Sequence, residues 1–170
     1  NELKLSGAGF SEDILVIDVL RMSRKILPRL ERYALWFVAE KLGIDFRQEH
    51  RALSDVGLTV EVFLKLKDML YGKGVYDPAS FLHLFAVSGN IVNDISSQKL
   101  AQIQEAIDLG VRLKIRYLSS SGDITDREVS PEKVIQERNV YYMVGHCSLR
   151  NDERSFRIDS ILDMEILNEI

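Results

Sequence analysis

The stretch VRLKIRY, residues 111–117, divides the sequence into two parts with different hydrophobic periods. Its apolar residues alternate with the cations Arg112, Lys114 and Arg116, which is the pattern of a β-strand with one buried face. The sequence SSGD at 120–123 follows, and its residues are typical of a tight turn. The stretch therefore predicts the first strand of a β-hairpin.

Further short strands are expected after this turn. The segments are 127–129, 134–135, 140–147, 154–159 and 162–167. They are separated by turn sequences such as ERN at 137–139 and NDE at 151–153. Four or five short strands joined by tight turns predict a small curled sheet or barrel.

Residues upstream of the strands have the period of helices. The expected helices are 19–27, 33–42, 51–70 and 97–109. Pro28 ends the first helix, and Gly43 stands where a left-handed cap would end the second. Breakers such as GKG at 72–74 and SGN at 88–90 interrupt the segment between, so we expect a linker that packs on a neighbour.

The composition excludes several classes of protein. The 170 residues are 46% apolar and 28% charged, with a net charge of −4, which is typical of a soluble globular protein. No apolar run approaches the roughly 20 residues that span a bilayer, so no membrane helix is expected. The single Cys147 forms no internal disulfide and suits a reducing compartment, so a cytoplasmic location is expected.

One candidate catalytic pair lies in EHRALSD, residues 49–55. Taken alone, His50 suits a capping or surface residue and Asp55 a solvated one. The segment and the stretch before it, from VIDVL at 16–20 to EKLGI at 40–44, resemble the third motif region of the DEDDh 3′–5′ exonucleases, which include the proofreading subunit of DNA polymerase III.

The resemblance implies roles for both residues. His50 matches the general base that takes a proton from the attacking water, and Asp55 matches a ligand of a Mg²⁺ or Mn²⁺ pair. The earlier acidic motifs of the family do not occur here, and the chain starts at Asn1 within the family pattern. We therefore expect a fragment that binds no metal pair and is inactive by itself, whereas its parent is an exonuclease.

The second half resembles the WYL domain, a bacterial module with a small Sm-like or SH3-like barrel. The matching segments are IRY at 115–117, REVSP at 127–131, YYM at 141–143 and RSFRID at 154–159. The pattern departs from the family at Tyr141, where Trp is usual, and at Ser160, where a further Arg is expected.

The WYL resemblance implies a ligand-sensing or nucleic-acid-binding module. Arginine suits phosphate and tyrosine suits base stacking, so the expected pocket residues are Tyr117, Arg127, Tyr142, Arg154 and Arg157. An alternative remains for the two last arginines, which could pair with neighbouring acidic residues on the surface.

These expectations combine into an α+β chain with three parts. Residues 1–71 are the helical C-terminal part of an RNase H-like exonuclease domain, 72–95 the linker, and 96–170 the WYL domain. The expected parent is a bacterial 3′–5′ DNA exonuclease of the polymerase III epsilon type, and the expected ligand of this chain is single-stranded DNA or a nucleotide.

Two other functions stay open. The WYL barrel could act as an adaptor for replication or repair proteins, or the parent could be a regulator with a degenerate nuclease half. Because the central sheet of the exonuclease fold is missing from the pattern, the helices are also expected to expose apolar surface or to form a homodimer.

Overall fold

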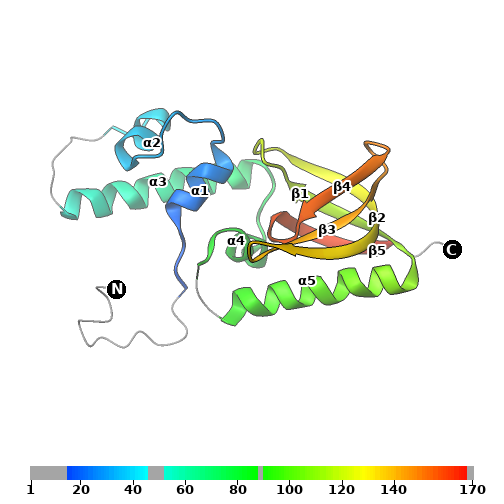
Figure 1. Ribbon diagram of the computed structural model, residues 1–170. Coiled ribbons are helices and arrows are strands. Elements are labelled where there is room, and N and C mark those ends of the chain that lie inside the picture. Colours follow the sequence, from blue (N-terminus) through cyan, green and yellow to red (C-terminus); the bar gives the residue numbers. More distant parts are fainter. Residues whose placement is uncertain (1–14, 46–51, 88–89, 168–170) are drawn as a thin grey trace.

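The computed structural model describes residues 15–45, 52–87 and 90–167 and has an α+β fold (Figure 1). Its elements in chain order are α1 (Val19–Ile26), α2 (Leu35–Lys41), α3 (Ala52–Gly72), α4 (Pro78–Phe85), α5 (Asn90–Leu109), β1 (Arg112–Leu118), β2 (Ile124–Glu137), β3 (Val140–Cys147), β4 (Asp152–Arg157), the 3-10 helix η1 (Ile158–Ser160) and β5 (Ile161–Leu167). Helices α1 to α3 lie at one end of the molecule, and the sheet with α5 beneath it lies at the other.

The first helices begin and end where local chemistry requires. The carboxylate of Asp18 caps α1 by accepting a hydrogen bond from the backbone N–H of Arg21 at 3.0 Å. Helix α1 ends at Ile26, two residues before Pro28, and Gly43 follows the C-cap of α2 with a φ of +67°. The predicted helices in this part of the chain are therefore confirmed, with bounds shifted by one or two residues.

Helices α1, α2 and α3 enclose one hydrophobic core. Met22, Ala39 and Leu66 are fully buried in it, as are Leu84 and Phe85 of α4. Leu118 of β1 and Leu162 of β5 belong to the same core, so it continues onto one end of the sheet. The two halves thus share a core instead of being joined only by the chain.

The segment predicted as a linker is packed and mostly helical. Helix α4 begins after Asp77, whose side chain accepts a hydrogen bond from the backbone N–H of Ser80 at 2.7 Å. Helix α5 begins at Asn90, seven residues before the predicted start at 97. Its fully buried residues Ile103 and Ala106 pack on the sheet, in a second core with Leu113, Ile115 and Met143.

The strands form one antiparallel sheet with the order β4-β3-β2-β1-β5. The predicted turn at 120–123 joins β1 to β2, and Arg138 and Asn139 join β2 to β3 with positive φ values of 48° and 63°. Strand β2 runs through Pro131 with a bulge before Lys133. At this point a Cβ on Gly145 would lie 2.2 Å from the carbonyl oxygen of Ser130, so only glycine fits there.

The sheet is curled but open, so the predicted closed barrel is not confirmed. Strands β4 and β5 are its two edges and have no backbone pairing with each other. Only η1 joins them, and four Cα steps reach about 15 Å at most, whereas a flat sheet would separate its edges by about 19 Å. The sheet must therefore curl, because the connection between its edges is shorter than a flat sheet allows.

Side chains bridge the curl near the end of β4. The backbone N–H of Arg157 donates a hydrogen bond to the hydroxyl of Tyr117 at 3.3 Å. The rings of Tyr117 and Phe156 pack edge to face, with centroids 5.2 Å apart.

None of the helices in the described parts of the chain has the length and hydrophobicity that a membrane-spanning helix needs.

Candidate functional site

A cavity of about 360 Å³ opens on the inner face of the curled sheet. Its lining includes Tyr117 of β1, Arg127 of β2, Arg154 and Phe156 of β4, and Arg150 of the turn before β4. Within the described part of the chain, no carboxylate lines this cavity. Three guanidinium groups without an acidic neighbour in the lining suit an anionic ligand.

The strand register explains why two of these arginines point inward. Residues directly opposite each other in an antiparallel sheet share a face. Arg127 lies opposite the fully buried Ile115, so it points toward the inner face. Arg154 precedes the buried Phe156 by two residues and lies opposite Gly145, so it points to the same side.

Weak contacts hold the cavity arginines in place. The Nε of Arg127 donates to the hydroxyl of Thr125 at 3.0 Å. Arg154 lies 3.6 Å from a carboxylate oxygen of Asp152, but these side chains are 54% and 64% exposed, so the ion pair contributes little. An anionic ligand would therefore displace little when it binds Arg154.

Tyr117 supplies a polar group at the wall of the cavity. Burial is the main reason that its pKa is raised above the usual range, so the phenol stays protonated near neutral pH. Its oxygen accepts the hydrogen bond from Arg157, and the hydroxyl hydrogen stays available as a donor. A phosphate oxygen or a base edge fits such a donor.

The structure places the other two predicted pocket residues outside this cavity. Tyr142 and Arg157 lie opposite each other in β3 and β4. The guanidinium of Arg157 donates two hydrogen bonds to Asp159, from Nε at 3.1 Å and from a terminal nitrogen at 2.6 Å. The cavity thus brings together Tyr117, Arg127 and Arg154 from the predicted set, whereas Arg157 is occupied by a carboxylate.

Asp159 connects the sheet to the helical half. Arg21 of α1 lies 3.3 Å and Lys25 3.7 Å from its carboxylate oxygens, and Lys25 also donates to the hydroxyl of Ser160 at 3.0 Å. Burial alone would raise the pKa of Asp159, but the hydrogen bonds of Arg157 and the nearby cations lower it to about 2. Burial lowers the pKa of Lys25 to about 8, although Asp159 opposes this effect.

A histidine is buried at the same junction of the two halves. Only 3% of His83 is exposed, and its Nε2 lies 3.2 Å from the hydroxyl of Ser96. Its Nδ1 lies 3.2 Å from the Nζ of Lys99, which also donates to the carbonyl of Ile161. Burial, followed by the charge of Lys99, lowers the pKa of His83 to about 4, so the ring is neutral near pH 7.

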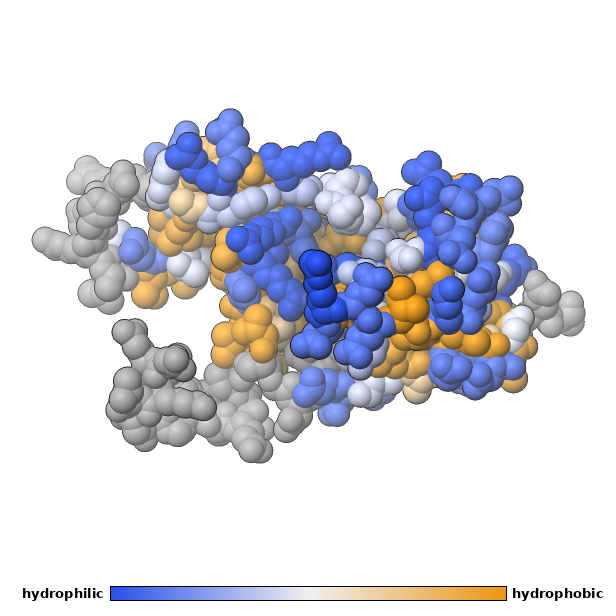
Figure 2. Space-filling model, viewed as in Figure 1, coloured by the Kyte–Doolittle hydropathy of each residue, from blue (hydrophilic) through white to orange (hydrophobic). Residues whose placement is uncertain are grey.

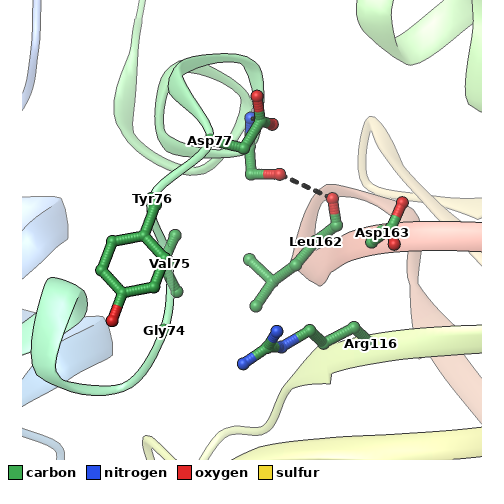
Figure 3. A pocket seen from close by; sticks show the side chains of 8 residues that line it. Gly74, Val75, Tyr76, Asp77, Arg116, Leu162 and Asp163 are labelled. Atoms are coloured by element: carbon green, nitrogen blue, oxygen red, sulfur yellow. Dashed lines mark hydrogen bonds between the residues drawn. The ribbon is translucent and has the colours of Figure 1, made fainter.

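A second cavity of about 370 Å³ lies between the α3–α4 connection and the β1 and β5 strands (Figure 3). Arg116 lines it together with two carboxylates, Asp77 and Asp163. Arg116 donates to the backbone carbonyl of Lys73 at 3.2 Å, and the hydroxyl of Ser80 donates to that of Leu162 at 2.6 Å. This cavity has no excess of cations and its polar groups join the two halves, so it is a weaker candidate for an anion.

The predicted exonuclease residues are only partly within the described chain. His50 lies outside the described residues. Asp55 is exposed in the first turn of α3, where its backbone carbonyl accepts a hydrogen bond from Thr59 at 2.8 Å. Among the described residues, no group of three or more His, Cys, Asp or Glu side chains could hold a metal ion. Asp55 alone does not form a site for a metal pair.

Comparison with known proteins assigns a family to each half. Residues 98–166 match the WYL domain model, and residues 3–63 match the model of the exonuclease family. The chain therefore contains a WYL domain joined to a region of the exonuclease family, as the sequence motifs predicted.

Three relatives are each similar to a part of the chain. The chain is 42% identical over 60 residues to the DNA polymerase III subunit epsilon of Aquifex aeolicus, covering 34% of this chain and 30% of that protein. It is 37% identical over 62 residues to the PolC-type DNA polymerase III of Staphylococcus saprophyticus, covering 36% and 4%. A third relative, 31% identical over 68 residues, is the HTH-type transcriptional regulator YobV of Bacillus subtilis, with 40% and 22% covered.

The chain spans less than a third of the length of each of these relatives. Among solved structures, proteasome accessory factor B/C of Arthrobacter aurescens is similar, with a TM-score of 0.43 and 21% identity, covering 79% of this chain and 20% of that chain.

Sequence reasoning missed Arg150, Lys25 and the junction role of Asp159. Arg150 follows the end of β3 in a turn, and only the β3–β4 register brings it to the cavity. Asp159 and Arg21 are separated by 138 positions in the sequence. A local signal, the excess of cations in residues 19–41, existed for Lys25 but not for Arg150 or Asp159, because residues 150–159 contain three Arg and three acidic residues.

Proposed function

We propose that the WYL domain of this chain binds the phosphate groups of single-stranded DNA or of a nucleotide in the cavity beside Tyr117, Arg127 and Arg154. The observation that carries the proposal is the cavity of about 360 Å³, which three arginines line and to which the described residues contribute no carboxylate. Guanidinium forks bind phosphate oxygens in pairs, and they keep their charge at every physiological pH.

The lining favours a phosphate that carries an aromatic group. Tyr117 and Phe156 present an aromatic wall next to the arginines. A nucleobase can pack against such a wall while its phosphate binds the guanidinium groups. A cavity of this volume accepts one nucleotide, so a single strand would place one of its nucleotides in the cavity at a time.

We further propose that the exonuclease-family region belongs to a metal-dependent enzyme that hydrolyses DNA from the 3′ end. Its similarity to replicative polymerase subunits supports this. In that enzyme, His50 would act as general base and Asp55 as a metal ligand. Residues 1–170 by themselves would act as a binding module, and the occupied WYL domain would steer or gate the nuclease through the junction at Asp159.

Fluorescence anisotropy with a short labelled single strand tests the binding proposal. The titration is made with the 170-residue chain in EDTA, at low and at physiological salt. We expect saturable binding that weakens as salt rises. Arg127→Ala and Arg154→Ala should each weaken it about tenfold, because each removes a phosphate contact.

Lys114→Ala is the matched control for these variants. Lys114 is an exposed cation on β1, adjacent to Ile115 and therefore on the opposite face from the cavity. Its loss should leave the affinity nearly unchanged. No binding at low salt, or equal losses in all three variants, would contradict the cavity as the site.

A second function, as a protein adaptor, has one observation in its favour. Val56, Val60 and Leu64 form a stripe along one face of α3 and are 61%, 50% and 43% exposed. Such a stripe suits contact with another protein or with a second copy of this chain. Sedimentation velocity of the wild type and of Val60→Glu tests it: a dimer that the substitution dissociates would support this function, and a monomer in both would exclude the homodimer.

A further inference from the structure

Cations are concentrated in the segment that forms α1, α2 and their connection. Residues 19–41 contain six Lys or Arg and two Glu, whereas the whole chain has a net charge of −4. Arg21 and Lys25 contact Asp159, so they belong to the junction with the sheet. Four others, Arg24, Arg29, Arg32 and Lys41, are exposed.

Three of these exposed cations lie against aromatic rings. The guanidinium of Arg32 is 5.8 Å from the ring centre of Trp36 and 5.4 Å from that of Phe37. Lys41 lies 5.2 Å from Phe37, and Arg24 lies 5.8 Å from Tyr33. Cation–π contacts occur about once in 70–80 residues, so four in this short segment are a concentrated local feature.

Trp36 is not needed to fill the core. It is 38% exposed, while its neighbours on α2, Val38 and Ala39, supply the buried face with 2% and 0% exposure. A large aromatic ring that stays accessible beside cations is the arrangement used to stack a nucleobase and hold its phosphates. Figure 2 shows hydrophilic side chains gathered over α2 and the segment before it.

We propose that residues 24–41 form a second binding surface, which binds single-stranded nucleic acid. On this surface a base stacks on the ring of Trp36, and the side chains of Arg32 and Lys41 contact the adjacent phosphates. This surface is independent of the WYL cavity, and α2 lies at the opposite end of the molecule from the sheet (Figure 1). Charge complementarity selects the partner. The exposed Glu31 and Glu40 reduce the excess of exposed cations to two, so binding is moderate and sensitive to salt.

The fluorescence of Trp36 gives a direct test, because it is the only tryptophan of the chain. The full chain is titrated with oligothymidylate in EDTA. We expect saturable quenching that decreases with salt and is weaker with duplex DNA of the same length. Inorganic polyphosphate, which carries the charge without bases, should bind with no comparable quenching.

A matched pair of variants separates this surface from general charge effects. Arg32→Ala should weaken the quenching titration about threefold to tenfold without changing the melting temperature. Lys67→Ala is the control, because Lys67 also lies over an exposed aromatic ring, that of Tyr71 on α3, 5.5 Å away. It should leave the titration unchanged.

The outcomes distinguish the two binding sites. Quenching that persists in Arg154→Ala supports the surface around Trp36 even if the WYL cavity proves wrong. Labelled DNA that binds without any quenching of Trp36 overturns the surface and leaves the cavity in place. Equal effects of Arg32→Ala and Lys67→Ala also overturn it.

Discussion

The cavity and the junction at Asp159 are both rich in cations, but only the junction is built around a carboxylate. The cavity brings Arg127, Arg150 and Arg154 together and has no carboxylate in its lining. At the junction, Arg21, Lys25 and Arg157 surround the carboxylate of Asp159. The number of cations therefore does not distinguish a ligand site from a structural junction. The distinction lies in how closely the cations are held by carboxylates: Arg157 donates two hydrogen bonds to Asp159, whereas Arg154 has only an exposed ion pair with Asp152.

Charged side chains at the junction are also more buried than Arg154 at the cavity. The side chain of Asp159 is 22% exposed and that of Lys25 is 18% exposed, whereas Arg154 is 54% exposed. Asp159 and Lys25 have lost much of their hydration and need each other. Arg154 is still hydrated, so it can exchange water for a ligand.

Removal of the shared carboxylate should have the largest effect. In Asp159→Asn, three partly buried cations lose their acidic partner, and we expect the free energy of unfolding to fall by about 2–4 kcal/mol. Urea denaturation followed by circular dichroism measures it. Asp152→Asn, which removes the exposed partner of Arg154, is the control and should cost less than about 0.5 kcal/mol. Similar losses of unfolding free energy in both variants would show that the carboxylates of Asp159 and Asp152 do not differ in this way.

Acid should weaken the junction and not the cavity. Because the pKa of His83 is lowered to about 4 in the fold, the unfolded chain binds the proton more readily. The stability contributed by neutral His83 is therefore fully present above about pH 6.5 and falls by about 3 kcal/mol as the pH drops to 4. Below this range the protonation of Asp159, with its pKa of about 2, continues the loss.

Melting temperatures between pH 4 and pH 7 measure this effect. His83→Gln should flatten the upper part of the pH profile, while His146→Gln, at an exposed position on β3, should not. The lining arginines keep their charge throughout, so anion binding by the folded chain should change little. If His83→Gln leaves the pH dependence of the melting temperature unchanged, His83 does not cause the loss of stability in acid.

Two arginines of β4 should separate binding from stability. Arg154→Ala is expected to reduce the affinity for the labelled strand about tenfold, with a change in stability below about 0.5 kcal/mol. Arg157→Ala is expected to do the reverse, with a loss of about 1–2 kcal/mol and nearly unchanged affinity, because it removes a pair of charged hydrogen bonds to Asp159. Anisotropy and denaturation of both variants decide whether Arg157 belongs to the ligand site.

The smallest expected effect concerns the bridge across the curl. Tyr117→Phe keeps the edge-to-face contact with Phe156 but removes the acceptor for the N–H of Arg157. We expect a loss of about 1 kcal/mol in unfolding free energy. Tyr141→Phe, on a side chain that is 41% exposed, serves as the control. No difference between the two variants would show that the hydrogen bond does not hold the curl.

Local patterns predicted most of the elements. Alternation in VRLKIRY placed β1, the residues at 137–139 placed the turn before β3, and Pro28 placed the end of α1. The start of α5 was missed because SGN at 88–90 favours a break, although packing of Ile103 and Ala106 on the sheet holds the helix. The closed barrel was not confirmed, because closure depends on pairing between the two edge strands.

The sequence predicted that the candidate site contains Arg and Tyr side chains, but not which of these side chains line it. Tyr117, Arg127 and Arg154 reach the cavity, while Arg157, three residues from Arg154, turns to Asp159. Adjacent strand residues point to opposite faces, so this choice depends on register and on which face a neighbour covers. Family resemblance gave the set of candidates, and the register selected among them.

By itself, the sequence determined the periods of the helices and strands, the turns between them and the places where cations gather. These properties are local, because they depend on residues a few positions apart. Only the tertiary structure decided which cations meet a carboxylate. Arg21 and Asp159 are 138 positions apart, and a charge that packing buries keeps its ion partner, whereas a charge left at an open cavity stays available for a ligand.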